Sequence, residues 1–291
     1  MPFFSIIIPT YNRAHLIEAS INSVLAQTYT NFEVLIVDDG STDDTKAVLN
    51  KYKDDRIRII YQENGERGKA RNNGVQNALG DYVFFLDSDD LIYPNHLQVA
   101  FDAISKLEDP AFFHSRYEEI HGDIKKQVPP LFANTLRANV IRQNKFACQF
   151  YLKRAVALEI PFSENRDLKI GEDWEVIIKV AMRYKLHFTN EVTAAIVQHG
   201  ERTMQLASPE TIIASRNILI DNLRQDSEVN APILGHVWSE LTTLAALSAA
   251  INNDKRTALK YLWQGIKSKS GHLFKRRTLA IFKKIIFNAK A

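Results

Sequence analysis

The chain of 291 residues contains one cysteine, Cys148, which excludes an intramolecular disulfide and any metal site built from several cysteines. It also lacks a long hydrophobic run. The longest uncharged apolar-rich stretch, Leu241 to Asn253, falls short of the roughly 18–20 residues that span a bilayer. The first residues carry neither a positively charged region nor a cleavage site, so we expect no secretory signal. The expected location is the cytoplasm, either free or peripheral on the inner face of the membrane.

Acidic residues are missing from the end of the chain. From Lys255 to Ala291 there are eleven basic residues and no acidic one. Residues 1–200 carry 23 basic and 27 acidic side chains, a net charge of −4, whereas residues 201–291 carry 14 and 7, a net charge of +7. The net charge of +3 for the whole chain is therefore an average of two opposite regions.

The first hundred residues alternate between short apolar runs and segments with helical spacing. Apolar runs rich in β-branched and aromatic residues predict buried strands at Phe3–Ile8, Glu33–Val37, Ile57–Tyr61 and Tyr82–Leu86. The segments between them predict helices at Ala14–Leu25, Asp44–Tyr52 and Gly68–Leu79, with Ser41 or Thr42 capping the second helix. Strands that alternate with helices through short loops indicate an α/β fold with a mostly parallel sheet.

Polar clusters follow three of these strands. They are Thr10-Tyr11-Asn12-Arg13, Asp38-Asp39 and Asp87-Ser88-Asp89-Asp90. In such sheets ligands bind at the carboxyl ends of the strands, where crowded carboxylates repel one another unless a cation lies among them. Aspartate oxygens suit Mg²⁺ or Mn²⁺, and Mg²⁺ usually takes part of its ligand shell from phosphates. Gly68-Lys69-Ala70-Arg71-Asn72 opens a helix and favours an anion, so the pattern indicates a nucleotide substrate.

Several nucleotide-binding and phosphate-handling classes fit less well. The chain has no Gly-x-x-x-x-Gly-Lys-Ser/Thr loop, and no Gly-x-Gly-x-x-Gly follows the first strand. A phosphohydrolase of the haloacid dehalogenase type also places Asp-x-Asp after an apolar strand, but Leu91-Ile92-Tyr93 follows where that class needs Thr or Ser. A non-catalytic nucleotide-binding or scaffold module is the second alternative.

Four blocks of the sequence carry a family resemblance. They are Ser5–Arg13, Val34–Asp43, Gly68–Gly74 and Phe84–Asp90. In their order and spacing over roughly residues 3–110 they resemble the opening of family 2 glycosyltransferases, which have the GT-A fold. The resemblance implies a nucleotide-diphospho-sugar transferase with a mostly parallel central sheet flanked by helices. The expected division is a catalytic domain over 1–205, with a nucleotide-binding half (1–110) and an acceptor-binding half (111–205), and a helical region over 206–291.

The resemblance also implies roles for individual residues. The nucleotide site would comprise Pro9, Thr10, Tyr11, Arg13, Asp38, Asp39, Asn64, Arg71 and Asp87. Within it, Asp39 reads the base, commonly uracil, while Asn64 and Arg71 lie along the nucleotide and its diphosphate. Asp87 faces the ribose, and Asp89 binds a divalent metal, Mn²⁺ or Mg²⁺. Asp87 and His199 are further candidate ligands of that metal.

A later motif supplies a candidate base. Gly171-Glu172-Asp173-Trp174-Glu175 resembles the family's Glu-Asp motif, which implies that Asp173 deprotonates the acceptor hydroxyl and that Glu172 supports it. Direct attack by that hydroxyl would invert the anomeric centre. A carboxylate at a helix start is also an ordinary partner of the helix dipole, so this alternative stays open. The Gln-x-x-Arg-Trp motif of processive members is absent, which favours transfer of a single sugar.

The end of the chain is expected to be helical, over Glu210–Leu223, Val237–Asn252, Arg256–Lys267 and Phe274–Asn288. The last segment mixes apolar and basic residues. It either lies on an anionic membrane surface near a lipid-linked acceptor, through residues 274–291, or packs on the catalytic domain or on a twin subunit. The expected partners are a nucleotide-sugar donor, UDP-linked, and a glycan or lipid-linked glycan acceptor. Nucleic acid is not expected, because the basic stretch carries no recognition motif.

Aromatic side chains in the middle of the chain offer two interpretations. They could stack on sugars, but core packing is the expectation for most of them. The residues concerned are Phe112, Phe113, Tyr117, Tyr151 and Phe162.

Overall fold

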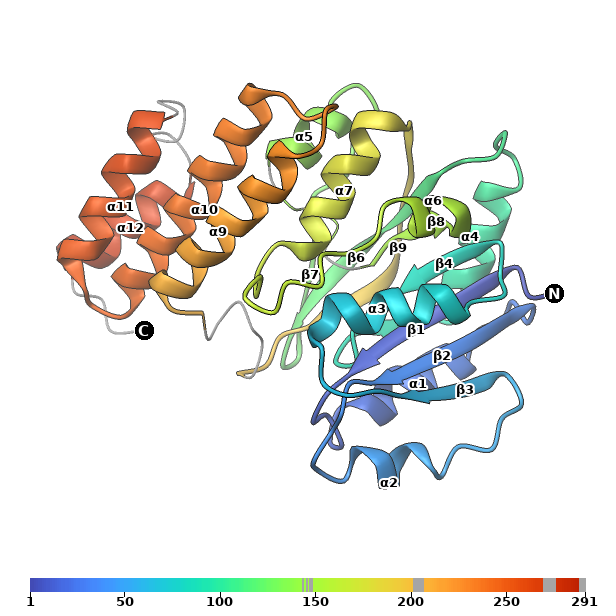
Figure 1. The fold of residues 1–291 in the computed structure, drawn as a ribbon. Helices are drawn as coiled ribbons and strands as arrows, with labels where there is room; N and C mark the ends of the chain where they lie inside the picture. The colour runs from blue at the N-terminus through green and yellow to red at the C-terminus, as the bar shows by residue number, and fades with distance from the viewer. Residues whose placement is uncertain (143, 145, 147–148, 201–206, 269–275, 288–291) are drawn as a thin grey trace. The chain divides into compact units, whose positions relative to one another are not determined.

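The structure is a computed structural model that describes residues 1–142, 144, 146, 149–200, 207–268 and 276–287 (Figure 1). Cys148 lies outside the described residues. The chain forms two compact units. The first comprises Met1–Arg137, Phe146–Arg166 and Arg183–His199, and the second comprises Ala138–Lys145, Asp167–Met182 and Gly200–Ala291.

The first unit is built on a sheet whose opening strands are parallel. These are β1 (Phe4–Thr10), β2 (Phe32–Asp38), β3 (Ile57–Tyr61) and β4 (Tyr82–Phe85), in the order β3-β2-β1-β4. The sheet continues through β8 (Tyr151–Lys153), β6 (Phe112–His121), β9 (Leu186–Val197) and β5 (Leu91–Ile92), and β7 (Ile124–Gln127) pairs with β6.

The expectation of a mostly parallel sheet therefore holds for the first four strands and needs correction beyond them. β8 is antiparallel to both β4 and β6, and β5 is antiparallel to β9, whereas β6 and β9 are parallel. β8 has only three residues, so it leaves no periodic signal in the sequence from which a strand direction can be predicted.

The first strand extends past Pro9, where the sequence predicted that it ends. Pro9 pairs with Val37 of β2, although proline removes a ladder donor. On the other side, β4 pairs with β1 only as far as Ile7, and the carbonyl of Ile7 accepts from the N–H of Leu86 (3.0 Å). The missing N–H of Pro9 faces that side, beyond the end of β4, so the proline costs the sheet no hydrogen bond.

Helices cover both faces of the parallel strands. α1 (Ile17–Leu25), α2 (Thr45–Leu49) and α4 (His96–Ile104) share a core with one face, whereas α3 (Glu66–Asn77) crosses the other face (Figure 1). Short helices α5 (Leu136–Arg142) and α6 (Arg154–Glu159) follow. The five aromatic residues for which core packing was expected are all buried, at 8% exposure or less, which confirms that interpretation.

The predicted cap of α2 is wrong. Asp44 precedes the helix, and its side chain makes no capping hydrogen bond. Ser41 and Thr42 bond instead to the loop after β1: the Ser41 hydroxyl accepts from the N–H of Asn12 (2.9 Å), and the N–H of Thr42 donates to the Asn12 side chain (2.8 Å). The two residues therefore join neighbouring loops and do not start a helix.

The second unit is helical. Its helices are α7 (Glu172–Arg183), α9 (Pro209–Arg224), α10 (Ala231–Ile251), α11 (Lys255–Ser268) and α12 (Arg276–Phe287). The side chains of Ser208 and Asn230 cap α9 and α10, each followed by a proline in the first turn. No helix in the described part of the chain is long and apolar enough to cross a membrane.

The last helix uses its apolar residues for packing. Ile281 is fully buried, and Phe282 and Ile285 pack against the small-residue cluster of α10 and α11. Arg277 forms an ion pair with the buried Glu240 of α10 (2.5 Å). The sequence offered the catalytic domain or a twin subunit as protein partners, and the neighbours described here are α10 and α11. Phe274 and Lys275 of this segment lie outside the described residues.

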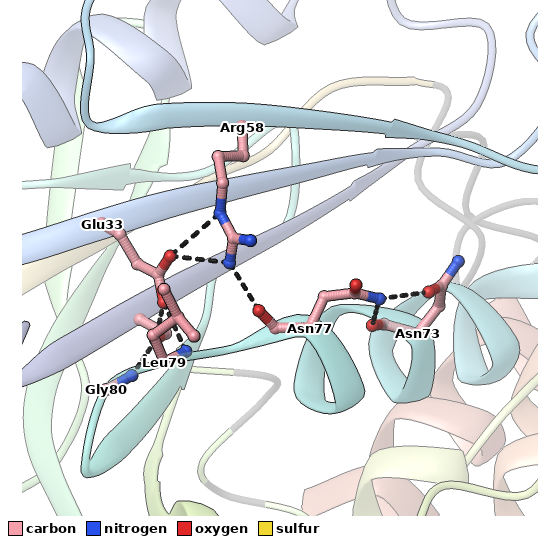
Figure 2. Close-up of polar contacts among 7 residues, drawn as sticks. Glu33, Arg58, Asn73, Asn77, Leu79 and Gly80 are labelled. Atoms are coloured by element: carbon pink, nitrogen blue, oxygen red, sulfur yellow. Dashed lines mark hydrogen bonds and ion pairs between the residues drawn. The ribbon is translucent and has the colours of Figure 1, made fainter. Parts of the chain in front are cut away.

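A buried carboxylate joins the strands at the edge where β1 and β4 begin (Figure 2). Glu33 of β2 accepts from the Ser5 hydroxyl and from the N–H of Leu79, each at 2.6 Å. Its other oxygen binds the Arg58 guanidinium at 2.8 Å, and Arg58 also donates to the carbonyl of Asn77 at the end of α3. One side chain thus connects three strands and the loop that leads from α3 to β4.

We expect Glu33→Ala to lower the free energy of unfolding by about 2–4 kcal/mol, because it leaves buried donors without an acceptor. Arg58→Ala is the matched control. The Arg58 side chain is 42% exposed against 9% for Glu33, so its loss should cost less than about 1 kcal/mol. Urea unfolding of both variants checks this. Equal losses would contradict a role centred on Glu33.

Two histidines lie in the core of the first unit. His96 is 1% exposed, and its Nδ1 lies 2.8 Å from the Thr193 hydroxyl. His114 is equally buried and donates from Nδ1 to the carbonyl of Gln149 (2.9 Å). Burial, together with the charge of His114, lowers the pKa of His96 to about 3, and burial lowers the pKa of His114 to about 4. Both rings are therefore neutral in the folded protein.

Stability should consequently fall as the pH drops from 7 to 5.5. The unfolded chain protonates both rings below about pH 6.5, whereas the folded protein does not, so the unfolded state binds more protons in this range. Urea unfolding across this pH range measures how the free energy of unfolding changes with pH, and hence the number of protons taken up on unfolding. His114→Phe should reduce that number by up to one. A wild-type free energy of unfolding that does not change over this range would contradict the prediction.

Candidate functional site

The three polar clusters predicted from the sequence meet at one edge of the sheet. Thr10 pairs with Asp38 at the ends of β1 and β2. The N–H of Leu86 donates to the carbonyl of Ile7, which places the end of β4 on the other side of β1. All three strands run in the same direction, so their carboxyl ends lie together.

The first two loops are held together by Asn12. Its backbone has a φ of 52°, a left-handed conformation that Asn tolerates better than most residues. Its side-chain oxygen accepts from the N–H groups of Thr42 (2.8 Å) and Asp43 (3.3 Å). The N–H of the next residue, Arg13, donates to the Thr45 hydroxyl (2.9 Å). Beside this junction Tyr11 is 45% exposed, which leaves its ring available to a ligand.

Asp39 occupies a buried position directly after β2. Its carboxylate accepts from the Gln62 side chain (2.6 Å) and from the N–H of Gly65 (2.8 Å). Burial raises the pKa of Asp39 above the usual value for aspartate, and these hydrogen bonds oppose the rise. The Asn64 side chain donates to the carbonyl of Asp39 (3.0 Å). Asp39 and Asn64 together fix the segment 62–65 against the end of β2.

Two further predicted residues line this edge. Asp38 is buried and accepts from the N–H of Ser41 (2.9 Å), which closes a turn after β2. The buried hydroxyl of Thr10 has no hydrogen-bond partner among the described residues. A buried hydroxyl without a partner is costly, so Thr10 is suited to bind a ligand atom at this edge. Pro9 is buried within β1.

Arg71 reaches the end of β4 from α3. The helix lies very close to β1, because a Cβ atom on Gly74 would be 2.5 Å from the Ile7 side chain. Arg71 is 1% exposed, and its Nη2 lies 2.8 Å from the Asp87 carboxylate. Its guanidinium also lies over the ring of Phe162, 5.2 Å from the centroid. Burial and two partners fix this cation at the sheet edge.

Asp89 meets His199, which follows β9. Their Oδ2 and Nε2 atoms lie 2.9 Å apart, and the two side chains are 13% and 19% exposed. Asp87, Asp89 and Asp90 each offer a carboxylate oxygen, and these oxygens lie within 4.8 Å of one another. Such a group of oxygens suits a hard divalent cation such as Mg²⁺ or Mn²⁺. The structure therefore brings His199 together with Asp89 of the Asp-x-Asp motif.

Asp90 was not among the predicted site residues. It is 1% exposed, and its carboxylate accepts from the N–H of Val197 (3.0 Å) and from the Gln149 side chain (3.4 Å). Its carbonyl accepts from the Ser20 hydroxyl (2.8 Å). Asp90 thus joins the Asp-x-Asp loop to the end of β9, two residues before His199. The sequence showed the acidic run, but a partner 107 positions away leaves no local signal.

The candidate base belongs to the second unit. Glu172 and Asp173 lie in the first turn of α7. The Asp173 carboxylate accepts from the N–H of Trp174 and from the Asn144 side chain, both at 2.8 Å. Glu172 is buried and Asp173 is half-buried.

We expect Asp90→Ala to lower the free energy of unfolding by about 1–3 kcal/mol and to speed hydrogen exchange at the Val197 amide, because that donor loses its buried acceptor. Asp90→Asn is the matched control. It keeps an oxygen that can accept from Val197 and should retain most of the protection. Unchanged exchange in the alanine variant would contradict the assigned contact.

Solved structures show which class of protein has this architecture. S. aureus TarS 1–349, solved in complex with UDP-GlcNAc, gives a TM-score of 0.67 at 21% identity, over 99% of this chain and 89% of that one. PcManGT, a mannosyltransferase from Pyrobaculum calidifontis solved with GDP-Man and Mn²⁺, gives 0.62 at 18% identity, over 99% and 88%. The fold is that of GT-A glycosyltransferases, which confirms the predicted fold class.

The sequence comparison then gives the family. Residues 5–161, more than half of the chain, match the family described as "Glycosyl transferase family 2". The chain belongs to this family. WfgD of Escherichia coli, a UDP-Glc:alpha-D-GlcNAc-diphosphoundecaprenol beta-1,3-glucosyltransferase, is 40% identical over 121 residues, which make up 41% of this chain and 47% of WfgD. The matched region spans less than half of the length of this and the other curated relatives, such as one from Rickettsia felis (30%).

Proposed function

We propose that this chain is an inverting glycosyltransferase. It would move one hexosyl or N-acetylhexosaminyl group from a UDP-sugar to a hydroxyl of a glycan or lipid-linked glycan. The observation that carries the proposal is the arrangement of Arg71, Asp87, Asp89 and His199 at the carboxyl edge of the sheet of a family 2 chain. The UDP-GlcNAc complex of TarS and the UDP-glucose donor in the name of WfgD support the choice of donor.

The nucleotide would lie along the ends of β1 and β2. Tyr11 offers an exposed ring beside Pro9, and Thr10 offers a buried hydroxyl. Asp39 and Asn64 would contact the base and nucleoside, because they lie at the end of β2 on a segment fixed by hydrogen bonds. Arg13 and Asp38 shape the two loops that close this side of the site.

The diphosphate would lie between Arg71 and a divalent metal. Asp89 and Asp87 would hold Mn²⁺ or Mg²⁺, with His199 as a further ligand. The carboxylate oxygens of Asp87, Asp89 and Asp90, which lie within 4.8 Å of one another, fit such an ion. Such an ion would supply positive charge for the departing nucleoside diphosphate. Arg71 supplies a fixed positive charge beside Asp87 at the same edge. PcManGT was solved with Mn²⁺, which supports manganese as the first ion to test.

Asp173 would take the proton from the acceptor hydroxyl. Its two oxygens accept from Trp174 N–H and from Asn144, so the carboxylate is held in one orientation at the start of α7. Glu172 stands beside it in the same turn and would support it. Attack by the acceptor oxygen on the anomeric carbon, as the bond to the diphosphate breaks, gives inversion in a single step.

A membrane and a second copy of the chain complete the proposal as partners. A lipid-linked acceptor would bring the enzyme to an anionic membrane surface, and residues 274–291 are the segment that the sequence offers for this contact. Packing of a twin subunit on the same segment is the alternative.

The test is transfer from a panel of UDP-sugars in the presence of Mn²⁺. We expect Asp173→Asn to lower kcat by about 10²–10⁴-fold while UDP binding is retained, because a general base acts only in the chemical step. Asp89→Ala should instead weaken Mn²⁺-dependent UDP binding itself. Asp102→Asn, an exposed aspartate of α4, is the control and should behave as the wild type.

The outcomes separate the alternatives. Near-normal turnover by Asp173→Asn would remove that residue from the role of base, and UDP binding unchanged in Asp89→Ala would remove it from the metal site. Nucleotide binding without turnover of any donor would indicate a scaffold protein. Release of free phosphate without sugar transfer would indicate a phosphohydrolase.

A further inference from the structure

α11 is fixed in one rotation about its axis by close packing on α10. A Cβ atom on Gly265 would lie 2.5 Å from the Thr243 side chain, so the backbones approach closely at this point. The Ser239 hydroxyl donates to the carbonyl of Gly265 (2.8 Å), and Ala258 and Leu262 are buried on the same side. The opposite side of the helix is therefore committed to the outside of the second unit.

That outer side is apolar at its centre and basic around it. Leu259 is 48% exposed and Trp263 is 68% exposed. Three basic residues on the same side of the helix are exposed as well: Arg256, Lys260 and Lys267. At 3.6 residues per turn these five positions fall within an arc on the order of 100°, so they form a single stripe along the helix. We call them the α11 stripe.

Trp263 is unusual within its own unit. Trp174 is 3% exposed and donates from its ring nitrogen to the carbonyl of Val140 (2.8 Å). Trp238 is half-buried, and the guanidinium of Arg216 lies 4.7 Å from its ring centroid. Trp263 instead presents most of its surface to solvent, next to an exposed leucine. Exposed tryptophan and leucine between lysines and arginines are typical of helices that lie in a membrane interface.

The neighbouring helices α10 and α12 also carry exposed apolar and basic side chains. Ile251, at the end of α10, and Leu279 and Ile286 of α12 are 55%, 62% and 64% exposed. Arg276 and Lys283 of α12 are exposed as well. No acidic residue occurs from Lys255 to the end of the chain, so this part of the sequence is strongly basic, and Arg277 pairs with Glu240 of α10. A twofold contact between two such stripes would bring like charges together, which disfavours a second copy as the occupant.

We propose that the α11 stripe docks on an anionic lipid bilayer. Trp263 and Leu259 enter the headgroup region, while Arg256, Lys260 and Lys267 extend their apolar stems along it and place their charges at lipid phosphates. The main contact with the membrane then lies on α11. This helix precedes the segment 274–291, which the sequence offered as a membrane contact. This inference rests on the membrane partner of the proposed function and names its contact surface, and its test requires no sugar transfer.

The test uses the full chain with vesicles that contain phosphatidylglycerol and with vesicles of phosphatidylcholine alone. On the anionic vesicles we expect co-sedimentation, which added salt weakens, and a blue shift of tryptophan emission. Trp263→Phe should abolish the shift, because the other two tryptophans are buried or covered. Trp263→Ser combined with Leu259→Ser should weaken binding about tenfold or more.

Charge reversal gives the second measurement. Lys260→Glu combined with Lys267→Glu should also weaken binding at least about tenfold, since each basic residue contributes to attraction by anionic lipid. Lys51→Glu combined with Lys53→Glu changes the net charge equally at exposed positions of the first unit and should bind nearly as the wild type. Circular dichroism confirms that each variant is folded.

Several results would overturn the proposal. One is equal loss of binding in both charge-reversal pairs, which would indicate attraction by net charge alone. Another is vesicle binding without an emission shift. Dimerisation that depends on Trp263, without vesicle binding, would assign the stripe to a second copy. Donor turnover measured without vesicles should be the same in stripe variants and wild type, so failure of the glycosyltransferase assignment would be recognised separately.

Discussion

The candidate site depends on the buried carboxylate of Asp90, which holds distant segments of the chain together by hydrogen bonds. Asp90 accepts from the amide of Val197 and from Gln149, and its carbonyl accepts from Ser20 of α1. These partners lie between 59 and 107 positions away along the chain. The Asp-x-Asp loop lies near the middle of the first unit along the chain and His199 lies at its end, and the Asp90–Val197 contact joins them beside the pairing of β5 with β9. Local folding of either segment would not do so.

The carboxylates at this edge would repel one another in isolation, and each has a different compensation. Arg71 binds Asp87, His199 lies against Asp89, and a backbone amide donates to Asp90. The three arrangements differ in exposure: Asp90 is 1% exposed, whereas the side chain of Asp87 is 28% exposed. Carboxylate oxygens that retain contact with solvent are those suited to bind an ion. Nearby, burial raises the pKa of Asp39, whose charge is held by fixed donors.

Much of the first unit could be predicted because its signals are local. Strands such as β1 and β2 are continuous apolar runs, and the polar residues that follow them fall at one edge once the strands are parallel. Thr10, Asp39, Asp87 and Asp89 were predicted to lie at this edge in this way, and Arg71 was predicted from the start of the helix that contains it. The partner of Asp90 could not be, because it is set by tertiary packing and not by spacing. For the same reason the antiparallel direction of β8, a strand of three residues, could not be predicted from the sequence.

The helical unit was harder to predict for a different reason. The periodicity of the last helix correctly indicates an apolar side but does not say what covers it, and α12 packs on α10 and α11 through Ile281. The α11 stripe also could not be predicted from the sequence, because Leu259 and Trp263 are residue types usually found in a core, and their exposure becomes clear only once the buried face of the helix is known.

Gly74 determines how far Arg71, on the same helix, reaches toward the candidate site. α3 can lie as deep as it does on β1 because no methyl group stands at position 74 to meet Ile7, which is fully buried and cannot move aside. Arg71, almost one turn earlier, owes its reach to Asp87 to that depth. A single added carbon on the side of the helix that faces the sheet would lift the guanidinium away from the carboxylate. The position of a charge at the site is thus set by an absent atom in the core.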